Sequence, residues 1–222
     1  MFDLEQVLEK HPDMEPFVRS LYQEQIAGTI GMYAELRKAE EVSMTDRRTG
    51  LKNGRYLDDI LPHAIEHGKR HKEPISVLYI DMNGLKMIND TQGHDKGNEA
   101  IEDMSLVIQY AIRAEDTVTR GGAESDEVVV VLPGTDNKGA STAAYRVAQS
   151  IDKHFGGSPS VSIGIATYDP RSNDPVFLGI DIIQRAEASM YEAKRTRKNG
   201  SNFGNYNMSL YLNGKSRISC HG

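Results

Sequence analysis

Short apolar runs and stretches with helical periodicity alternate along most of the chain. The runs ISVLYIDM (75–82) and SVSIGIATY (160–168) are short, apolar and rich in β-branched residues, which is typical of buried strands. Apolar residues recur at helical spacing in longer stretches, which predict helices over 98–114, 137–155 and 179–198. The pattern therefore predicts a domain in which strands and helices alternate.

Further strands complete this domain. The segments DTVTR (116–120) and EVVVVLP (127–133) flank a short polar stretch and predict an antiparallel hairpin. A last strand is expected within SNFGNYNMSLYL (201–212). The predicted order, β-α-β-β-α-β-α-β, indicates an α+β fold with helices over a mainly antiparallel sheet.

Residues 1–44 form a separate helical block. Its apolar residues recur at roughly helical spacing; they are Phe17, Leu21, Ile26, Ile30, Tyr33, Leu36 and Val42. Gly28 and Gly31 each weaken the helix by about 1 kcal/mol relative to alanine. The pattern fits a dimerising or signal-relay helix, and also a helix packed on its own domain or on a missing partner. We thus expect a helical extension (1–44), a domain (45–213) and a tail (214–222).

Composition narrows the functional classes. The 222 residues are 38% hydrophobic and 26% charged, as in ordinary soluble proteins, and the net charge of −6 gives no reason to expect binding to nucleic acid or membranes. The single cysteine, Cys220, excludes a disulfide framework and a cysteine metal site. The start lacks a secretory pattern, and no apolar run approaches the ~18 residues of a membrane helix. We expect a cytoplasmic protein without membrane insertion.

Acidic residues stand at the ends of predicted strands. Asp81 closes one strand, and Asp126 with Glu127 opens another. If these strands are neighbours, the carboxylates converge at one edge of the sheet, and such hard oxygen ligands suit Mg²⁺ or Mn²⁺. A single acid at a strand end is often merely solvated, but a group around a hairpin favours a metal site.

Two other polar patterns are candidates for ligand binding. Lys194 and Lys198 lie four residues apart and share a helical face, which suits a triphosphate or a solvated helix end. Asn89 and Asn98 belong to the polar stretch INDTQGHDKGN (88–98), expected as a loop. Their amides suit either a base edge or ordinary turns and caps.

These residues together resemble the GGDEF domains, whose active members are diguanylate cyclases. The resemblance spans Thr45 to about Asn202 and rests on ordered motifs. The motifs are TDRRTGLKNGRYL (45–57), IDMNGLKMINDTQGHDKGN (80–98), SVSIGIA (160–166) and AEASMYEAKRTRKN (186–199). It implies a palm-like, ferredoxin-like fold and a homodimer in which each subunit holds one GTP. The 3′-hydroxyl of each nucleotide then attacks the α-phosphate of the other to make cyclic di-GMP.

The signature segment, RGGAESDEVVVVLP (120–133), is longer than the family pattern. Counting back from the strand puts Asp126 and Glu127 on the signature acids, whereas counting forward from Arg120 puts Glu124 and Ser125 there. We prefer the first register, because it keeps both carboxylates against the strand that aims them. The turn then lacks the family's pair of glycines, which supply positive φ and a close approach of the ligand to the backbone.

The resemblance also implies roles for the other candidates. Asp81 and the Met82 carbonyl are expected to bind Mg²⁺ or Mn²⁺ together with Asp126 and Glu127. Lys194 and Lys198 are expected to hold phosphates, the latter in place of the family's arginine.

The base-reading pair of the family corresponds to Asn89 and Asn98, where the second position is an aspartate in the family. An amide offers one acceptor and one donor group, so Asn98 predicts relaxed or altered choice of the purine nucleoside triphosphate.

The sequence RAED, Arg113 to Asp116, stands where the family's inhibitory site has Arg-x-x-Asp, and implies binding of cyclic di-GMP. Two functions remain open: a cyclase, favoured by Asp81, Asp126, Glu127 and Lys194, and an inactive receptor or dimerising scaffold, favoured by the altered turn and Asn98.

Overall fold

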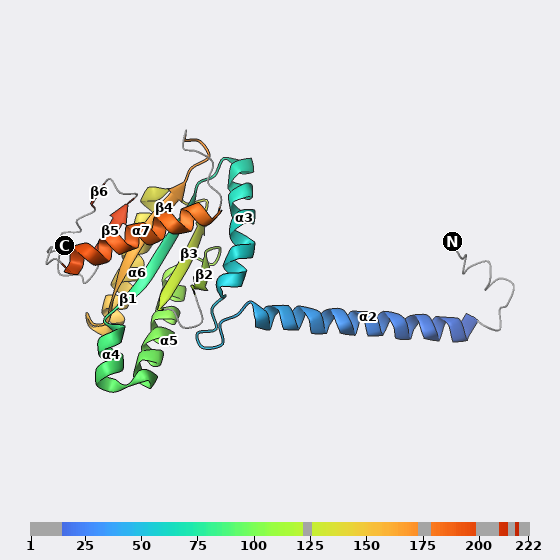
Figure 1. Ribbon diagram of the computed structural model, residues 1–222. Helices are drawn as coiled ribbons and strands as arrows, with labels where there is room; N and C mark the ends of the chain where they lie inside the picture. Colours follow the sequence, from blue (N-terminus) through green and yellow to red (C-terminus); the bar gives the residue numbers. More distant parts are fainter. Residues whose placement is uncertain (1–14, 122–125, 173–178, 199–208, 213–215, 218–222) are drawn as a thin grey trace. The chain divides into compact units, whose positions relative to one another are not determined.

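The centre of the unit Met44–Gly222 is a sheet with the strand order β2-β3-β1-β4-β5-β6 (Figure 1). The strands are β1 (Ile75–Asn83), β2 (Thr117–Arg120), β3 (Glu127–Pro133), β4 (Ser160–Tyr168), β5 (Ser209–Leu212) and β6 (Ser216–Arg217). The computed structural model describes residues 15–121, 126–172, 179–198, 209–212 and 216–217.

The pairing of the strands confirms the predicted α+β class. β2 and β3 form the expected antiparallel hairpin, β3 pairs antiparallel with β1, and β1 pairs antiparallel with β4. β5 lies parallel to β4. β6 falls within the expected tail and pairs antiparallel with β5.

Alternation along β1 creates two cores, one on each face of the sheet. Leu78, Ile80 and Met82 belong to one buried cluster, which α5 (His94–Ala111) and α6 (Asn137–Phe155) cover. Val77 and Tyr79 belong to the other, under α3 (Gly54–His71) and α7 (Gly179–Lys198). Because side chains alternate between faces, Asp81 shares the face of Tyr79 and points toward the α3–α7 side.

A glycine of β4 sets how closely α7 approaches the sheet. A Cβ atom on Gly164 would lie 2.0 Å from the carbonyl oxygen of Ala186 and 2.2 Å from the amide nitrogen of Met190. Only glycine permits this approach, and Gly164 is buried beneath the helix. The motif SVSIGIA therefore places α7, and with it Lys194, directly over the strands.

Two helices differ from the sequence expectation. Residues 54–71 form α3, which the pattern did not predict. It begins after Asn53, whose side chain accepts a hydrogen bond from the Tyr56 amide, and it buries Leu57, Leu61 and Ile65. Pro62 within the helix obscured this stripe, because proline usually interrupts a helix.

The polar stretch expected as a loop is instead largely helical. Leu85–Gln92 form α4, and His94 starts α5, with Gly93 between them. α4 has only 8 residues, too short a stretch for apolar periodicity to predict a helix, and none of them is fully buried.

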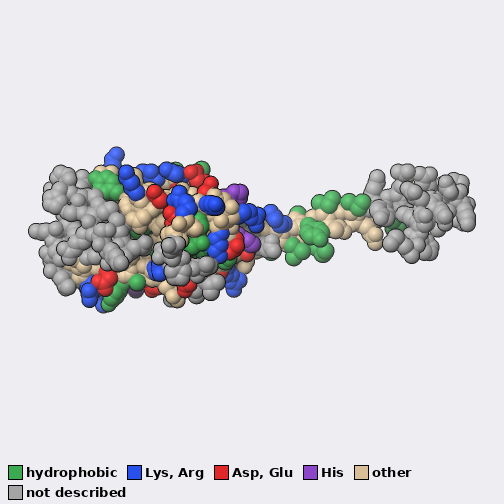
Figure 2. All heavy atoms as spheres, turned by 90° about the horizontal axis from the view of Figure 1, so that it is seen from above, with side chains coloured by type: hydrophobic (Ala, Val, Ile, Leu, Met, Phe, Trp, Pro, Cys, Tyr) green, Lys and Arg blue, Asp and Glu red, His purple; other side chains and the backbone are tan. Residues whose placement is uncertain are grey.

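The unit Met1–Ser43 contains α2 (Glu15–Ser43). Gly28 and Gly31 do not interrupt it. Large apolar side chains are about half or more exposed along it, and Figure 2 shows them on the helix surface. They are Leu21, Ile26, Ile30, Met32, Tyr33 and Leu36. The side chains of Phe17 and Val42 lie outside the described residues. None of the helices that the structure describes is long and apolar enough to span a membrane.

Candidate active site

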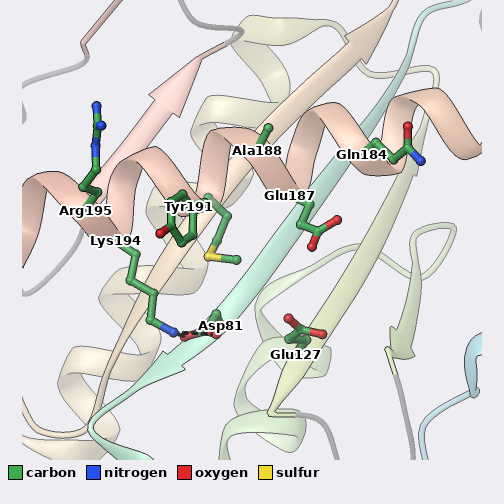
Figure 3. A pocket seen from close by; sticks show the side chains of 9 residues that line it. Asp81, Glu127, Gln184, Glu187, Ala188, Tyr191, Lys194 and Arg195 are labelled. Carbon is green, nitrogen blue, oxygen red and sulfur yellow. Dashed lines mark hydrogen bonds and ion pairs between the residues drawn. The ribbon is translucent and has the colours of Figure 1, made fainter.

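Asp81 and Lys194 form the centre of the candidate site. The Lys194 Nζ donates to both oxygens of Asp81, at 2.7 Å to Oδ1 and 2.8 Å to Oδ2 (Figure 3). Asp81 is only 5% exposed, at the end of the α7-facing side of β1. Two residues 113 positions apart thus meet because α7 packs closely on the sheet.

The strand register brings the signature acids to the same place. Glu127, the first residue of β3, lies directly opposite Asp81 in the β1–β3 ladder, and Asp126 precedes it. The alternative signature positions, Glu124 and Ser125, lie outside the described residues. In the preferred register, the acids therefore open the strand that neighbours the Asp81 strand.

Two pockets meet at Lys194, and the signature acids are divided between them. One, of about 560 Å³, is lined by Asp81, Glu127 and a row of α7 side chains (Figure 3). The other, of about 480 Å³, is lined by Asp126 and by the segment 82–86 that enters α4. Lys194 lines both. The arrangement gives Asp126 and Glu127 different neighbours, although they are adjacent in sequence.

The charges around Asp81 suit a cation. Burial raises the pKa of Asp81, and the charges of Asp126 and Glu127 raise it further, although the Lys194 ammonium opposes the shift. The charges of Asp126 and Glu127 thus add to that of the buried Asp81 carboxylate, which binds Lys194. Among the residues that the structure describes, no set of three or more His, Cys, Asp or Glu side chains is placed to hold a metal ion. The carboxylate oxygens nevertheless suit Mg²⁺ or Mn²⁺. Lys194 is bound to Asp81, the carboxylate that such an ion would need.

The two candidate base-reading amides lie at the junction of α4 and α5. A Cβ atom on Gly97 would lie 1.9 Å from Asn89 Oδ1, so the absence of a side chain at Gly97 leaves room for the Asn89 amide. Asn98 follows Gly97, and both asparagines are half-buried. The α4–α5 hairpin therefore packs Asn89 against the turn of α5 that carries Gly97 and Asn98.

Of the two lysines expected to bind phosphate, the structure describes the side chain of Lys194 but not that of Lys198. Lys194 is in place at the junction of the two pockets. Lys198 is the last residue of α7, and its side chain lies outside the described residues. Lys86, which was not singled out from the sequence, lines the same pocket as Asp126.

Arg113 and Asp116 line a third pocket, of about 510 Å³, away from Asp81. The Arg113 amide donates to Asp116 Oδ2 at 2.9 Å, while Oδ1 is buried and accepts no hydrogen bond from the described residues. Burial raises the pKa of Asp116 against the effect of that Arg113 amide. Lys52 and Tyr110, the latter 88% exposed, line the same pocket and were not predicted.

Sequence reasoning also missed residues of α7 that face the larger pocket. Gln184, Glu187 and Tyr191 line it beside Lys194. Glu187 and Glu127 extend into the cavity from opposite walls (Figure 3). Glu187 precedes Lys194 by seven residues, a spacing that places both on one helix face and is detectable from sequence.

A buried ion pair braces the base of the signature loop. Arg120, only 3% exposed, contacts Asp46 Oδ1 at 3.0 Å, and the Arg120 amide donates to the Lys52 carbonyl at 2.8 Å. Burial acts to raise the pKa of Asp46, but hydrogen bonds from Thr49 and Arg120 outweigh it and hold the pKa below its usual value. The motif TDRRTGL is therefore tied to the end of β2.

This fold and site define a nucleotide-cyclase-like domain, and the family follows from the sequence. Residues 43–200 match the family GGDEF, described as "Diguanylate cyclase, GGDEF domain". The match covers more than half of the chain, so this protein belongs to the GGDEF family and carries a diguanylate cyclase-like domain. Diguanylate cyclases of this family generally use Mg²⁺ or Mn²⁺.

The relatives that match this chain include bacterial proteins. The response regulator PleD of Caulobacter vibrioides is 33% identical over 171 residues, covering 72% of this chain and 36% of PleD. The probable diguanylate cyclase DgcC of Escherichia coli is 30% identical over 168 residues, covering 73% of this chain and 44% of DgcC. The chain thus spans less than half the length of these curated relatives.

Solved GGDEF structures share the fold. The coiled coil and GGDEF domain of DgcB from Caulobacter crescentus, in complex with c-di-GMP, matches with a TM-score of 0.70 at 20% identity, over 87% of this chain and 98% of that one. The GGDEF domain of YfiN (TpbB) from Pseudomonas aeruginosa matches with a TM-score of 0.58 at 27% identity, over 75% of this chain and 94% of that one.

Proposed function

We propose that the GGDEF unit condenses two purine nucleoside triphosphates, nominally GTP, into a cyclic dinucleotide such as cyclic di-GMP. The observation that carries this proposal is the convergence of Asp81, Glu127 and Lys194 at one end of the sheet, with Asp126 beside them. These groups supply both the carboxylates and the cation that phosphoryl-transfer sites use.

Each condensation step is a substitution at phosphorus. The 3′-oxygen of one nucleotide forms a bond to the α-phosphorus of the other, the bond from that phosphorus to the bridging oxygen of the β-phosphate breaks, and pyrophosphate leaves. The second, reciprocal step closes the ring. We propose that Mg²⁺ or Mn²⁺ is held by Asp81, Asp126, Glu127 and the Met82 carbonyl. The bound ion would activate the attacking hydroxyl and neutralise the leaving group.

Lys194 has two partners in this proposal. Without nucleotide it neutralises the buried Asp81 carboxylate. When the triphosphate occupies the pocket of Asp126 and Lys86, the Lys194 ammonium is available to its phosphates, because it lines that pocket as well. By its place in the sequence, Lys198 is the second lysine that we propose binds phosphate.

Asn89 and Asn98 read the base in this proposal. A carboxylate at position 98 accepts hydrogen bonds from both N1–H and the exocyclic amine of guanine, whereas Asn98 offers one acceptor and one donor group. The amide also complements the donor–acceptor edge of adenine. We therefore propose that the protein discriminates between GTP and ATP weakly.

A second candidate function is a receptor for cyclic di-GMP. It is favoured by the pocket of Arg113 and Asp116, where a buried carboxylate oxygen accepts no hydrogen bond from the described residues. Guanine N–H groups suit such an acceptor, and arginine suits a phosphate or the guanine edge. The same pocket serves as an inhibitory product site if the cyclase is active.

The test is a product assay by liquid chromatography and mass spectrometry. Purified protein is incubated with Mg²⁺ or Mn²⁺ and GTP, ATP or both, beside Asp126→Ala and the matched variant Asp59→Ala, which changes an exposed aspartate of α3. We expect a cyclic dinucleotide from the wild type and Asp59→Ala, and at least about 100-fold less from Asp126→Ala.

Absence of product from a wild-type sample shown to be dimeric would contradict the cyclase proposal. Calorimetric titration with cyclic di-GMP then tests the receptor, which requires binding by the wild type and its loss in Arg113→Ala.

A further inference from the structure

Three of the seven histidines of the chain stand on α3, at positions 63, 67 and 71. A spacing of four residues places side chains along one face of a helix. His63, His67 and His71 are all exposed, so dissolved ions reach them. This face of α3 therefore presents a row of imidazoles, the side chains that bind transition metals most often in proteins.

The last two members of the row already lie side by side. The ring centroids of His67 and His71 are 4.3 Å apart, and the ring planes are tilted by 31°. Two nitrogens that bind one zinc ion, each at about 2.0–2.1 Å, lie no more than about 4 Å apart. A small rotation of the side chains would thus let both imidazoles bind one ion. Two histidines four residues apart on a helix are a known arrangement for zinc.

The pair spans the last turn of α3. The helix ends at Lys72, which has a left-handed backbone with a φ of 58° and donates its amide to the Gly68 carbonyl. This conformation favours glycine, so a lysine here makes the last turn less stable. The partial negative charge at a helix C-terminus also favours a cation nearby. An ion held by His67 and His71 would therefore close the turn that most needs support.

This turn packs against the segment that enters β1. A Cβ atom on Gly68 would lie 2.8 Å from the Glu73 carbonyl oxygen and 3.0 Å from the Ile75 Cδ1. Ile75 is the first residue of β1, whereas Asp81 lies near its other end. The histidine pair is therefore separate from the carboxylates of the candidate active site.

The surroundings of the pair favour a transition metal over Mg²⁺. Imidazole nitrogen suits zinc, copper and nickel, whereas Mg²⁺ prefers oxygen ligands. Lys69 is paired with Glu66 at 2.6 Å, and Arg70 and Lys72 are exposed in the same part of the helix. The positive charge of these basic side chains opposes an ion that binds through charge alone. Direct bonds from the metal to nitrogen must then supply the affinity.

We propose that His67 and His71 form a chelating site for a divalent transition-metal ion of the zinc and copper class, which stabilises the last turn of α3. Within the described part of the chain, no third His, Cys, Asp or Glu side chain completes the set. The other coordination positions are therefore left to water. This site is independent of the nucleotide chemistry proposed above.

The test is a calorimetric titration of the full chain with Zn²⁺ in the presence of excess Mg²⁺. The Mg²⁺ occupies sites made of carboxylates and leaves the imidazoles to zinc. The wild type is compared with His67→Asn, His71→Asn and the matched control His63→Asn, which makes the same change one turn earlier on the same helix face. Thermal unfolding is recorded for each protein with and without Zn²⁺.

We expect His67→Asn and His71→Asn to bind Zn²⁺ at least about tenfold more weakly than the wild type, because loss of a direct ligand costs no less than loss of an outer-shell partner. His63→Asn keeps the wild-type affinity, and Cu²⁺ binds the wild type more tightly than Zn²⁺ does. With Zn²⁺ at about 100 times its Kd, the unfolding midpoint rises by about 5 °C in the wild type and in His63→Asn only. Without metal, the four proteins unfold at similar temperatures.

Zinc affinity that is the same in His67→Asn, His71→Asn and the wild type would overturn the proposal. A wild type that binds no Zn²⁺ under these conditions would overturn it as well. Loss of binding in His63→Asn, with His71→Asn unaffected, would show that the assigned pair is wrong.

Discussion

At the residue scale, the candidate site combines charged side chains with Asn98, for which we propose a role in reading the base. Asp81 is buried and Lys194 is about one-third exposed, so removal of Lys194 would leave a buried carboxylate without its cation, whereas removal of Asp81 would leave an ammonium that solvent reaches. Asn98, by contrast, is half-buried and neutral.

We predict that Asn98→Asp sharpens the preference for GTP. A carboxylate at position 98 accepts hydrogen bonds from both guanine donors. The expected gain in discrimination against ATP is about 1–3 kcal/mol, or about tenfold to a hundredfold in kcat/KM. Competition between GTP and ATP in the product assay measures it. Asp95→Asn, at an exposed position in the first turn of α5, is the control. A strong preference for GTP in the wild type that Asn98→Asp leaves unchanged would contradict the prediction.

At the element scale, the turn around Asp46 ties the start of the domain to β2. The Asp46 Oδ1 accepts hydrogen bonds from the Thr49 amide at 2.9 Å, from the Thr49 hydroxyl at 2.7 Å and from Arg120 at 3.0 Å. Arg120 immediately precedes the signature loop, so the buried ion pair connects the first motif of the domain with the strand that leads into the acids.

We predict that Asp46→Asn destabilises the domain by about 2 kcal/mol at pH 7, as for the loss of hydrogen bonds to a charged group. Because the pKa of Asp46 is lowered on folding, its stabilising effect is present above the ordinary aspartate pKa, about 3.9. This stabilising effect is lost as the pH falls through the lower pKa that Asp46 has in the folded state. Urea unfolding at pH 7 and at pH 3 compares the full effect with a reduced one.

The difference between wild type and Asp46→Asn shrinks at the lower pH if the charge of Asp46 is responsible. A difference of equal size at both pH values would show that the effect comes from shape instead. Asp59→Asn, on the exposed surface of α3, is the matched control and shifts neither value.

The elements that the sequence predicted well are those with a strong local signal. The valines of 128–131 and the apolar run of β1 fit buried strands, and the helix 137–155 coincides with α6. The helices that it missed carry conflicting signals: Pro62 stands inside α3, and α4 has no fully buried residue.

Contacts between distant elements were harder to predict than the elements. Asp81 and Lys194 were each candidates, yet their contact depends on the approach of α7 over Gly164, which no local pattern encodes.

At the scale of the whole molecule, the proposed reaction needs two nucleotides and hence two GGDEF units. The exposed apolar side chains of α2 include Ile26 and Tyr33, seven residues apart, and Leu36, three residues after Tyr33. This is the spacing of a coiled-coil seam. We propose that a second copy of this helix covers the seam, which would raise the effective concentration of one GGDEF unit near the other.

We predict that Ile26→Glu with Tyr33→Glu converts the dimer to a monomer, because like charges then face each other along the seam. The control is Ala27→Glu with Ala34→Glu, which adds the same charge at the same spacing on a neighbouring helix face and keeps the dimer. Light scattering after size-exclusion chromatography measures the mass. In the product assay, the specific activity of the seam variant rises with protein concentration, as for a reaction between separate chains. A seam variant that stays dimeric would show that the copies meet through another surface.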